Sequence, residues 1–125
     1  LVLVAWILQE GETQQFDFML AFAQVDVECD IYMEITVGFV LKGNKKDYCL
    51  KLKKNIYGTK QAGRVWNKHV NKGLLKLGDV PSKIDHCVSY HGRSVFMVYV
   101  EDGIFSGPDK MTISQHIKGL QAKFT

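Results

Sequence analysis

The sequence has few cysteines, no long apolar run, and no basic residue in its first third. Three cysteines (Cys29, Cys49 and Cys87) are an odd number, widely spaced and without a Cys-x-x-Cys pair. This pattern indicates neither a disulfide framework nor a cysteine zinc site, and favours reduced thiols in an intracellular protein. The apolar segment 1–8 is far shorter than the ~20 residues that a membrane span requires. It also lacks the basic start and small-residue cleavage site of a signal peptide.

The chain does not begin with methionine, and both ends fall inside patterned segments. We therefore expect a piece of a longer protein. A length of 125 residues allows one domain with a single modest core. Hydrophobic residues make up 46% and charged residues 23%, which is ordinary for a globular protein. Internal repeats, low-complexity segments and linkers are absent.

Charge is distributed unevenly along the chain, although the net charge is only +3. Residues 1–41 hold seven acids and no base, whereas residues 42–76 hold eleven bases and one acid, Asp47. A basic stretch beside an acidic one suits a protein that binds both phosphates and metal ions. A solvated lysine-rich surface is the equally weighted alternative.

Hydrophobic periodicity predicts an α+β fold with a mainly antiparallel sheet and helices on one side. The best helix spans 61–77, with Gly78 where a C-cap belongs and Gly73 as an unfavourable interior residue. Its basic residues recur every four positions. We predict further helices at 1–10 and from Asp109, strands at 13–18, 48–52, 86–90, 94–100 and 103–106, and an extended segment at 31–40.

Two acidic sites lie far apart in sequence, each at the edge of a predicted strand. They are Asp17, and the pair Glu101 and Asp102, which we place in a tight turn between two strands. A carboxylate beside an apolar run is costly unless a cation compensates for it. Carboxylates that converge from different elements are what two-metal phosphoryl transfer requires. Taken singly, such acids are more often ordinary turn or strand-end residues.

Four motifs, in order, resemble the reverse transcriptases of copia-type LTR retrotransposons. Residues 15–22 are similar to the family's Gln-Leu-Asp-Val-Lys-Thr-Ala-Phe, and residues 30–40 to Ile-Tyr-Met-Glu-x-Pro-x-Gly-Phe. Residues 50–66 resemble Lys-Leu-x-Lys-x-Leu-Tyr-Gly-Leu-Lys-Gln-Ala-Pro-Arg-x-Trp. Residues 99–102, Tyr-Val-Glu-Asp, stand where the family has Tyr-Val-Asp-Asp. The resemblance covers nearly the whole chain.

The resemblance implies a palm-like antiparallel sheet with partial fingers, in which residues 1–125 form part of a reverse transcriptase domain without its thumb or RNase H region. It implies RNA-directed DNA polymerase activity with two Mg²⁺ ions on Asp17, Glu101 and Asp102. A primer–template and dNTPs would be the partners, in a cytoplasmic retrotransposon particle and without a membrane. Seven residues would form the nucleotide site: Phe18, Phe22, Tyr57, Gly58, Lys60, Gln61 and Arg64.

Within that site, Phe22 matches the aromatic gate whose flat ring leaves no room for a 2′-hydroxyl. Alone, a phenylalanine here would more often be a core residue. The basic residues of 60–76 could contact template. The four histidines, at 69, 86, 91 and 116, show no ligand-like spacing, so we assign them no metal role.

The match departs from the family at the principal turn ligand, where Glu101 replaces aspartate and moves the carboxylate out by one methylene. Such a displacement, on the order of 1 Å, can cost about a hundredfold in rate. Gly63 replaces a proline and Thr59 a leucine, and residues 19–25 lack the family's cation and turn glycine. We expect a degenerate enzyme with no measurable polymerase activity as this chain alone. A non-catalytic nucleic-acid-binding remnant and an inert product that does not fold stably are the alternatives.

Overall fold

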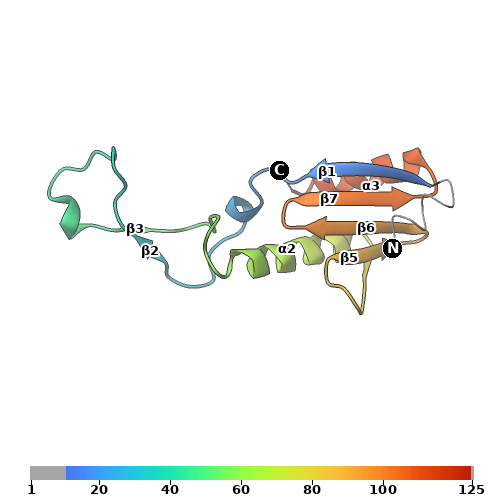
Figure 1. The fold of residues 1–125 in the computed structure, drawn as a ribbon, viewed down its shortest axis with the longest axis horizontal. Helices are drawn as coiled ribbons and strands as arrows, with labels where there is room; N and C mark the ends of the chain where they lie inside the picture. The colour runs from blue at the N-terminus through green and yellow to red at the C-terminus, as the bar shows by residue number, and fades with distance from the viewer. Residues whose placement is uncertain (1–10, 125) are drawn as a thin grey trace.

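The computed structural model describes residues 11–124 of the chain and divides into two visibly different parts. A sheet backed by helices forms the body, and residues 26–54, here called the arm, project away from it (Figure 1). The predicted helix at 1–10 lies outside the described residues. No helix among residues 11–124 is both long enough and apolar enough to cross a membrane.

The body is built on a five-stranded antiparallel sheet with the strand order β1-β7-β6-β5-β4. Its edge strand β1 comes from the start of the described chain and pairs with β7, so residues more than 80 positions apart become neighbours. The strands are β1 (Glu12–Asp17), β4 (Val80–Pro81), β5 (Val88–His91), β6 (Ser94–Tyr99) and β7 (Asp102–Gly107).

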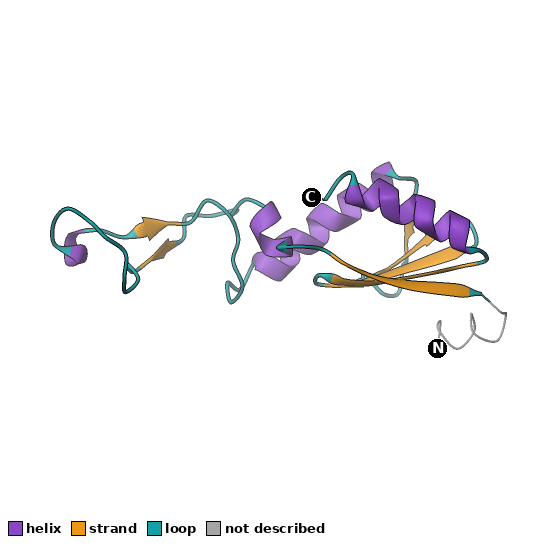
Figure 2. Ribbon diagram, turned by 90° about the horizontal axis from the view of Figure 1, so that it is seen from above, coloured by secondary structure: helices purple, strands orange, loops and turns teal. Residues whose placement is uncertain are grey.

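Helices α2 (Ala62–Lys76) and α3 (Lys110–Gln121) both lie on one face of this sheet (Figure 2). Helix α2 ends in a Schellman motif: Gly78 has φ 90°, its N–H bonds the Leu75 carbonyl, and the Asp79 N–H bonds that of Leu74. Helix α3 begins at Asp109, whose carboxylate accepts the Thr112 N–H at 2.8 Å. That bond is the main reason the pKa of Asp109 is lowered.

Gly73, which disfavours the helix from sequence, is required by packing. A Cβ built there would lie 2.2 Å from the Phe124 ring, which rests on the glycine. The same ring makes edge contacts with Phe18 and Trp66. Glycine destabilises a helix interior by about 1 kcal/mol relative to alanine, but at this position it leaves the space that the Phe124 ring occupies on α2.

The core lies between the helices and the sheet. Its members come from β1 and the segment after it, α2, β6, β7 and α3, and are joined by aromatic contacts such as the stacked rings of Phe16 and Phe96. The largest fully buried apolar side chains are Trp66, Phe96, Phe105, Ile113, Leu120 and Val70. One contiguous core thus joins α2 and α3 to β1, β6 and β7, while β4 and β5 are attached through the ladder to β6.

The arm contains very little regular structure and no buried residue. It carries a two-stranded ribbon, β2 (Tyr32–Met33) with β3 (Leu50–Lys51), and the short 3₁₀ helix η2 (Lys45–Asp47). Another 3₁₀ helix, η1 (Ala21–Gln24), precedes it and packs against α2. Asn55 closes the base of the arm, because its buried amide donates to the Val25 and Asp26 carbonyls.

The α+β class and antiparallel sheet predicted from sequence are confirmed. The helices at 61–77 and after Asp109 form, as do the strands near 13–18, 86–90, 94–100 and 103–106. The extended segment 31–40 is wrong beyond the two residues of β2, because nothing packs on it to hold a longer strand. The 48–52 strand likewise shortens to β3, and β4, η1 and η2 were not anticipated.

Candidate active site

The acidic edge of the sheet is built around the tight turn between β6 and β7. Val100 and Glu101 form this two-residue turn, and Asp102 is the first residue of β7 rather than part of the turn as predicted. Val100 has φ 57° while Glu101 has no positive φ, so a β-branched residue occupies a turn position at which glycine is usual. Such a residue in the left-handed region costs roughly 1–2 kcal/mol.

Neighbouring elements hold this strained turn in place. The Phe18 N–H donates to the Glu101 carbonyl at 2.8 Å, and the Trp66 indole N–H donates to the Val100 carbonyl at 2.5 Å. One bond comes from the end of β1 and the other from α2. Strain of this kind persists only where the surroundings over-determine the conformation, and it is concentrated at functional sites.

The register of β1 with β7 places Asp17 directly opposite Asp102. Two carboxylates far apart in sequence thereby meet at one corner of the sheet, beside Glu101. Both aspartates are exposed and Glu101 is half-buried. Within residues 11–124, none of the three makes an ion pair with a lysine, arginine or histidine.

Tyr57 reaches this corner from the segment before α2. Its hydroxyl donates to the Glu101 carboxylate. That hydrogen bond, with smaller contributions from burial and from the negative charges of Glu101 and Asp17, raises the pKa of Tyr57 to about 12. The phenol therefore stays neutral at physiological pH, and the Glu101 carboxylate is engaged by it.

The three carboxylates are close but do not form a complete cage. In the part of the chain that the structure describes, only one trio of His, Cys, Asp or Glu side chains brings its ligand atoms within 4.8 Å of one another, and it lies elsewhere. Asp17, Glu101 and Asp102 are not such a trio.

The aromatic residues of the predicted nucleotide site lie next to the acidic corner. Phe22, in η1, is buried, and its ring centroid is 4.6 Å from that of Tyr57. Phe18 is also buried and contacts Trp66 edge-on. Tyr57 is half exposed and covers the Phe22 ring on the solvent side of the core. Both phenylalanines are thus core members that also border the candidate site.

The remaining predicted residues follow Tyr57 into α2. Gly58 has φ 92° and no neighbour near its missing Cβ, so backbone conformation alone requires glycine there. Lys60 is exposed, and Gln61 precedes the helix with its side-chain nitrogen buried and without a partner among described residues. Arg64 pairs with Glu28 of the arm at 2.5 Å. The structure therefore gathers Asp17, Phe22, Tyr57, Glu101 and Asp102, but turns Arg64 toward the arm.

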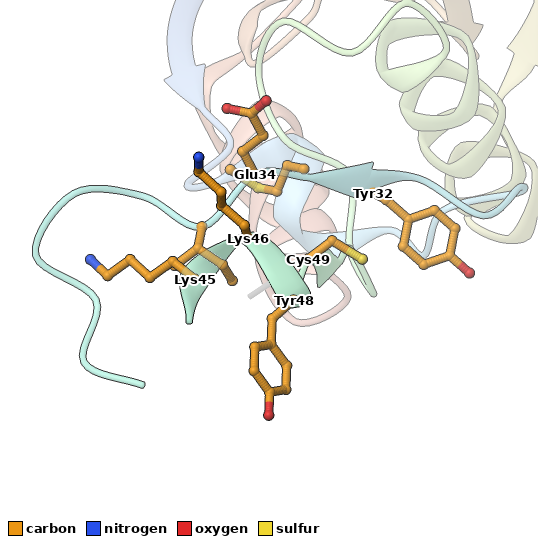
Figure 3. Close-up of a pocket in the computed structure, with 8 residues that line it drawn as sticks. Tyr32, Glu34, Lys45, Lys46, Tyr48 and Cys49 are labelled. Carbon is orange, nitrogen blue, oxygen red and sulfur yellow. The ribbon is translucent and has the colours of Figure 1, made fainter. Parts of the chain in front are cut away.

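A cavity of about 570 Å³ lies in the arm and away from this corner. It is bordered by β2, η2 and the residues just before β3. Figure 3 shows Lys46 and Glu34 pointing to one side of it and the Tyr48 ring to the other. Its walls are shallow and half-exposed, so we give the acidic corner precedence.

Sequence reasoning missed the trio that does cluster, which consists of Asp79, His91 and His116. These residues are separated by 12 and 25 positions and come from the α2–β4 connection, β5 and α3. Neither spacing is that of residues on one helix face or in a short metal-binding motif, so no pattern within a short stretch of sequence could have identified the trio.

Comparison with known proteins supports one family. The family described as reverse transcriptase (RNA-dependent DNA polymerase) matches residues 1–125. The chain is similar to the retrovirus-related Pol polyproteins of transposons RE2 and RE1 of Arabidopsis thaliana, with 35% and 34% identity over 90% of the chain. It is also 34% identical over 90% of its length to the Pol polyprotein of transposon TNT 1-94 of Nicotiana tabacum.

The chain spans only 8% of the length of each Arabidopsis relative and 9% of the tobacco one. No solved structure matches it. The family match nevertheless covers every residue, and the three relatives are all transposon Pol polyproteins. The chain therefore belongs to the reverse transcriptase family, in the group of copia-type LTR retrotransposons.

Proposed function

We propose that this chain is the palm segment, with part of the fingers, of an RNA-directed DNA polymerase that acts on a primer–template and dNTPs. The observation that carries the proposal is the pairing of Asp17 with Asp102 across β1 and β7, beside the strained turn that presents Glu101. Family membership supplies the reaction class, and the acidic corner supplies its location.

The chemistry of the donor set fits divalent magnesium. Carboxylate oxygens are the ligands Mg²⁺ prefers, and Asp17 and Asp102 are exposed and without a basic partner among described residues. Bound magnesium would activate the primer hydroxyl and stabilise charge on the triphosphate. Asp17, Glu101 and Asp102 would hold it. Without it, their mutual repulsion is relieved in part by the Tyr57 hydroxyl.

The chain's own aromatic residues would select the sugar. Phe22 and Tyr57 form a continuous aromatic wall beside the acidic corner. A ring fixed in the core leaves no space for a 2′-hydroxyl, so Phe22 would favour deoxynucleotides. The backbone of Phe18, tied to Glu101, would set the distance between this wall and the carboxylates.

Glu101 is the element that lowers the expected activity. Its carboxylate is one methylene longer than the aspartate of the family motif and is hydrogen-bonded by Tyr57. Both features hold it away from the position that a near-octahedral Mg²⁺ site demands. We therefore infer weak catalysis in a complete polymerase and none by the chain alone.

A chimera tests this proposal. These 125 residues would replace the matching segment of the tobacco Pol polyprotein, and templated dNTP incorporation would be measured with Mg²⁺ or Mn²⁺. We expect low activity, a rise of about tenfold to a hundredfold in Glu101→Asp, and loss in Asp17→Asn. The exposed Asp47→Asn in the arm is the matched control and should change little. Activity that survives Asp17→Asn and Asp102→Asn would refute the assignment.

Nucleic-acid binding without catalysis is the second candidate, favoured by the exposed bases of residues 42–76. Four of the eleven are already engaged: Lys51 by Asp30, Lys54 by Asp26, and both Arg64 and Lys68 by Glu28. The other seven are exposed and make no ion pair with described residues. They are Lys42, Lys45, Lys46, Lys53, Lys60, Lys72 and Lys76.

Salt titration of primer–template binding by the chain separates the candidates. Each phosphate contact contributes a slope of about −0.7 to −0.9 in log K against log salt. We expect contacts by several of the seven lysines, and a shallower slope in Lys45→Gln/Lys46→Gln. A slope near zero would exclude the binding role without touching the catalytic proposal, whose test is the chimera.

A further inference from the structure

A second polar cluster lies inside the body, separate from the acidic corner. Asp79 follows the Schellman turn that ends α2, His91 is the last residue of β5, and His116 lies on α3. Their ligand atoms lie within 4.8 Å of one another. The cluster therefore stands where the end of α2, the β5–β6 hairpin and α3 come together.

The cluster leaves buried charge uncompensated by hydrogen bonds. The Asp79 side chain is 0% exposed and that of His116 is 6% exposed. Among the described residues, neither carboxylate oxygen of Asp79 has a hydrogen-bond partner, and the same holds for Nδ1 of His91 and Nε2 of His116. A buried carboxylate without donors is strongly unfavourable unless a cation is close. The rings of Phe105 and Phe96 border His116 and exclude water from that side.

The distances between the Asp79 oxygens and the two histidine nitrogens fit ligands of a metal ion better than they fit hydrogen bonds. The two Asp79 oxygens lie 3.6 Å from His91 Nδ1 and 3.1 Å from His116 Nε2. Two ligands bound tetrahedrally at 2.0–2.1 Å should lie about 3.3 Å apart, between these values. The 3.1 Å contact would be an ion pair if His116 were protonated, but it is not a hydrogen bond. One ion placed among them would take one oxygen of Asp79 and one nitrogen of each histidine.

The cluster can be reached from solvent, which leaves room for a further ligand on a bound ion. A cavity of about 250 Å³ opens on the cluster, and its lining includes His91, His116, Thr112 and Gln115. An ion can enter by this route, and water can complete a four-coordinate shell. Two imidazoles and one carboxylate are a donor set for borderline transition metals, whereas Mg²⁺ prefers oxygen ligands only.

We propose that Asp79, His91 and His116 bind one divalent transition-metal ion of the zinc class, which cross-links α2, the β5–β6 hairpin and α3. This site lies outside the family motifs and does not depend on the polymerase proposal. Because the ion would bind the folded state and bring three elements together, it stabilises the body by mass action.

The test uses the full chain with Cys29, Cys49 and Cys87 replaced by serine, since thiolates bind Zn²⁺ on their own. After chelator dialysis, Zn²⁺ is titrated and stoichiometry and melting temperature are measured. We expect one Zn²⁺ per chain and an upward shift of about 10 °C at one hundred times Kd. Mg²⁺ at the same concentration should give no shift.

Three variants locate the ion. Asp79→Asn should abolish binding, and His91→Gln, whose side chain is 39% exposed and therefore tolerant of replacement, should weaken it at least tenfold. His86→Gln, an exposed histidine outside the trio, should bind as the parent does. No Zn²⁺ binding by the parent, or equal binding by His91→Gln and His86→Gln, would overturn the proposal. Loss in His86→Gln would assign the ion to another site and overturn it equally.

Discussion

The body and the arm are made from the same chain with similar residues, but only one of them has a core. The body buries phenylalanines, valines and a tryptophan between its sheet and helices. The arm exposes residues of the same kinds: Val37 is fully exposed, Val40 is 92% exposed and Phe39 is 46% exposed. The difference shows that apolar composition does not create a core unless a second layer is present to cover it.

The two regions are also held by different interactions. The arm depends on surface ion pairs such as Lys51 with Asp30 and Lys54 with Asp26, all of which are well exposed. Exposed pairs contribute little to stability. The body depends on packing, which contributes far more per residue. The arm should therefore respond weakly to mutation, and the body strongly.

A matched pair of phenylalanines provides the largest contrast. Phe96→Ala in β6 should lower the free energy of unfolding by about 3–5 kcal/mol, because a fully buried ring is lost and a cavity remains. Phe39→Ala in the arm should change it by less than about 1 kcal/mol. Urea unfolding of both variants measures this. Equal losses would mean that the arm shares the core of the body.

Two glycines of the same helix should respond with opposite sign. Gly73→Ala should destabilise by roughly 1–3 kcal/mol, since its Cβ would overlap the Phe124 ring. Gly63→Ala meets nothing within 4 Å, and should stabilise α2 by up to about 1 kcal/mol. The measurement is thermal unfolding followed by circular dichroism. A stabilising Gly73→Ala would show that Phe124 does not pack on the helix.

The joint between the regions should give an intermediate effect. Asn55→Ala removes the amide that bonds the Val25 and Asp26 carbonyls, and should cost about 1–2 kcal/mol. Asn44→Ala is the control, because Asn44 caps only the exposed helix η2 of the arm. Hydrogen exchange of the amides at 27 and 55, which bond the Lys53 and Val25 carbonyls across the joint, reports it directly. Unchanged protection in Asn55→Ala would contradict its closing role.

The smallest effect concerns titration at the acidic corner. Tyr57 should remain protonated at about pH 10.5, where an ordinary tyrosine is largely ionised, because its pKa is raised to about 12. Since the folded pKa lies above the usual value, the stabilisation by this hydrogen bond is complete below about pH 10 and is lost between about pH 10 and 12. Glu101→Gln should return the pKa toward 10.

Phenolate absorbance measures that change. At about pH 10.5 the parent and Tyr57→Phe should absorb alike, whereas Glu101→Gln should gain up to about three-quarters of one phenolate as the pKa of Tyr57 returns toward 10. The double variant Tyr57→Phe/Glu101→Gln is the control and should not gain this absorbance, because it lacks the phenol in question. A parent that already ionises Tyr57 at this pH would break the link between Tyr57 and Glu101.

Local patterns predicted much of the body because its elements have clear periodicity. The apolar face of α2, Gly78 at its end and Asp109 before α3 are signals that act over a few residues, and each appears as predicted. The prediction of an extended segment at 31–40 was wrong because this apolar stretch has no second layer of structure to pack against. Asp102 lies in β7 rather than in the turn because it pairs with Tyr99 of β6, while its position opposite Asp17 depends on the register with β1, which the sequence of the hairpin does not contain.

The sequence by itself determined the family and the order of its motifs, since these are carried by residues close together in the chain. The tertiary structure decided which distant side chains meet. It opposed Asp17 to Asp102, joined Tyr57 to Glu101, and brought Asp79, His91 and His116 together at a junction of three elements. Such contacts follow from strand register and helix packing, which depend on the whole core and not on local spacing.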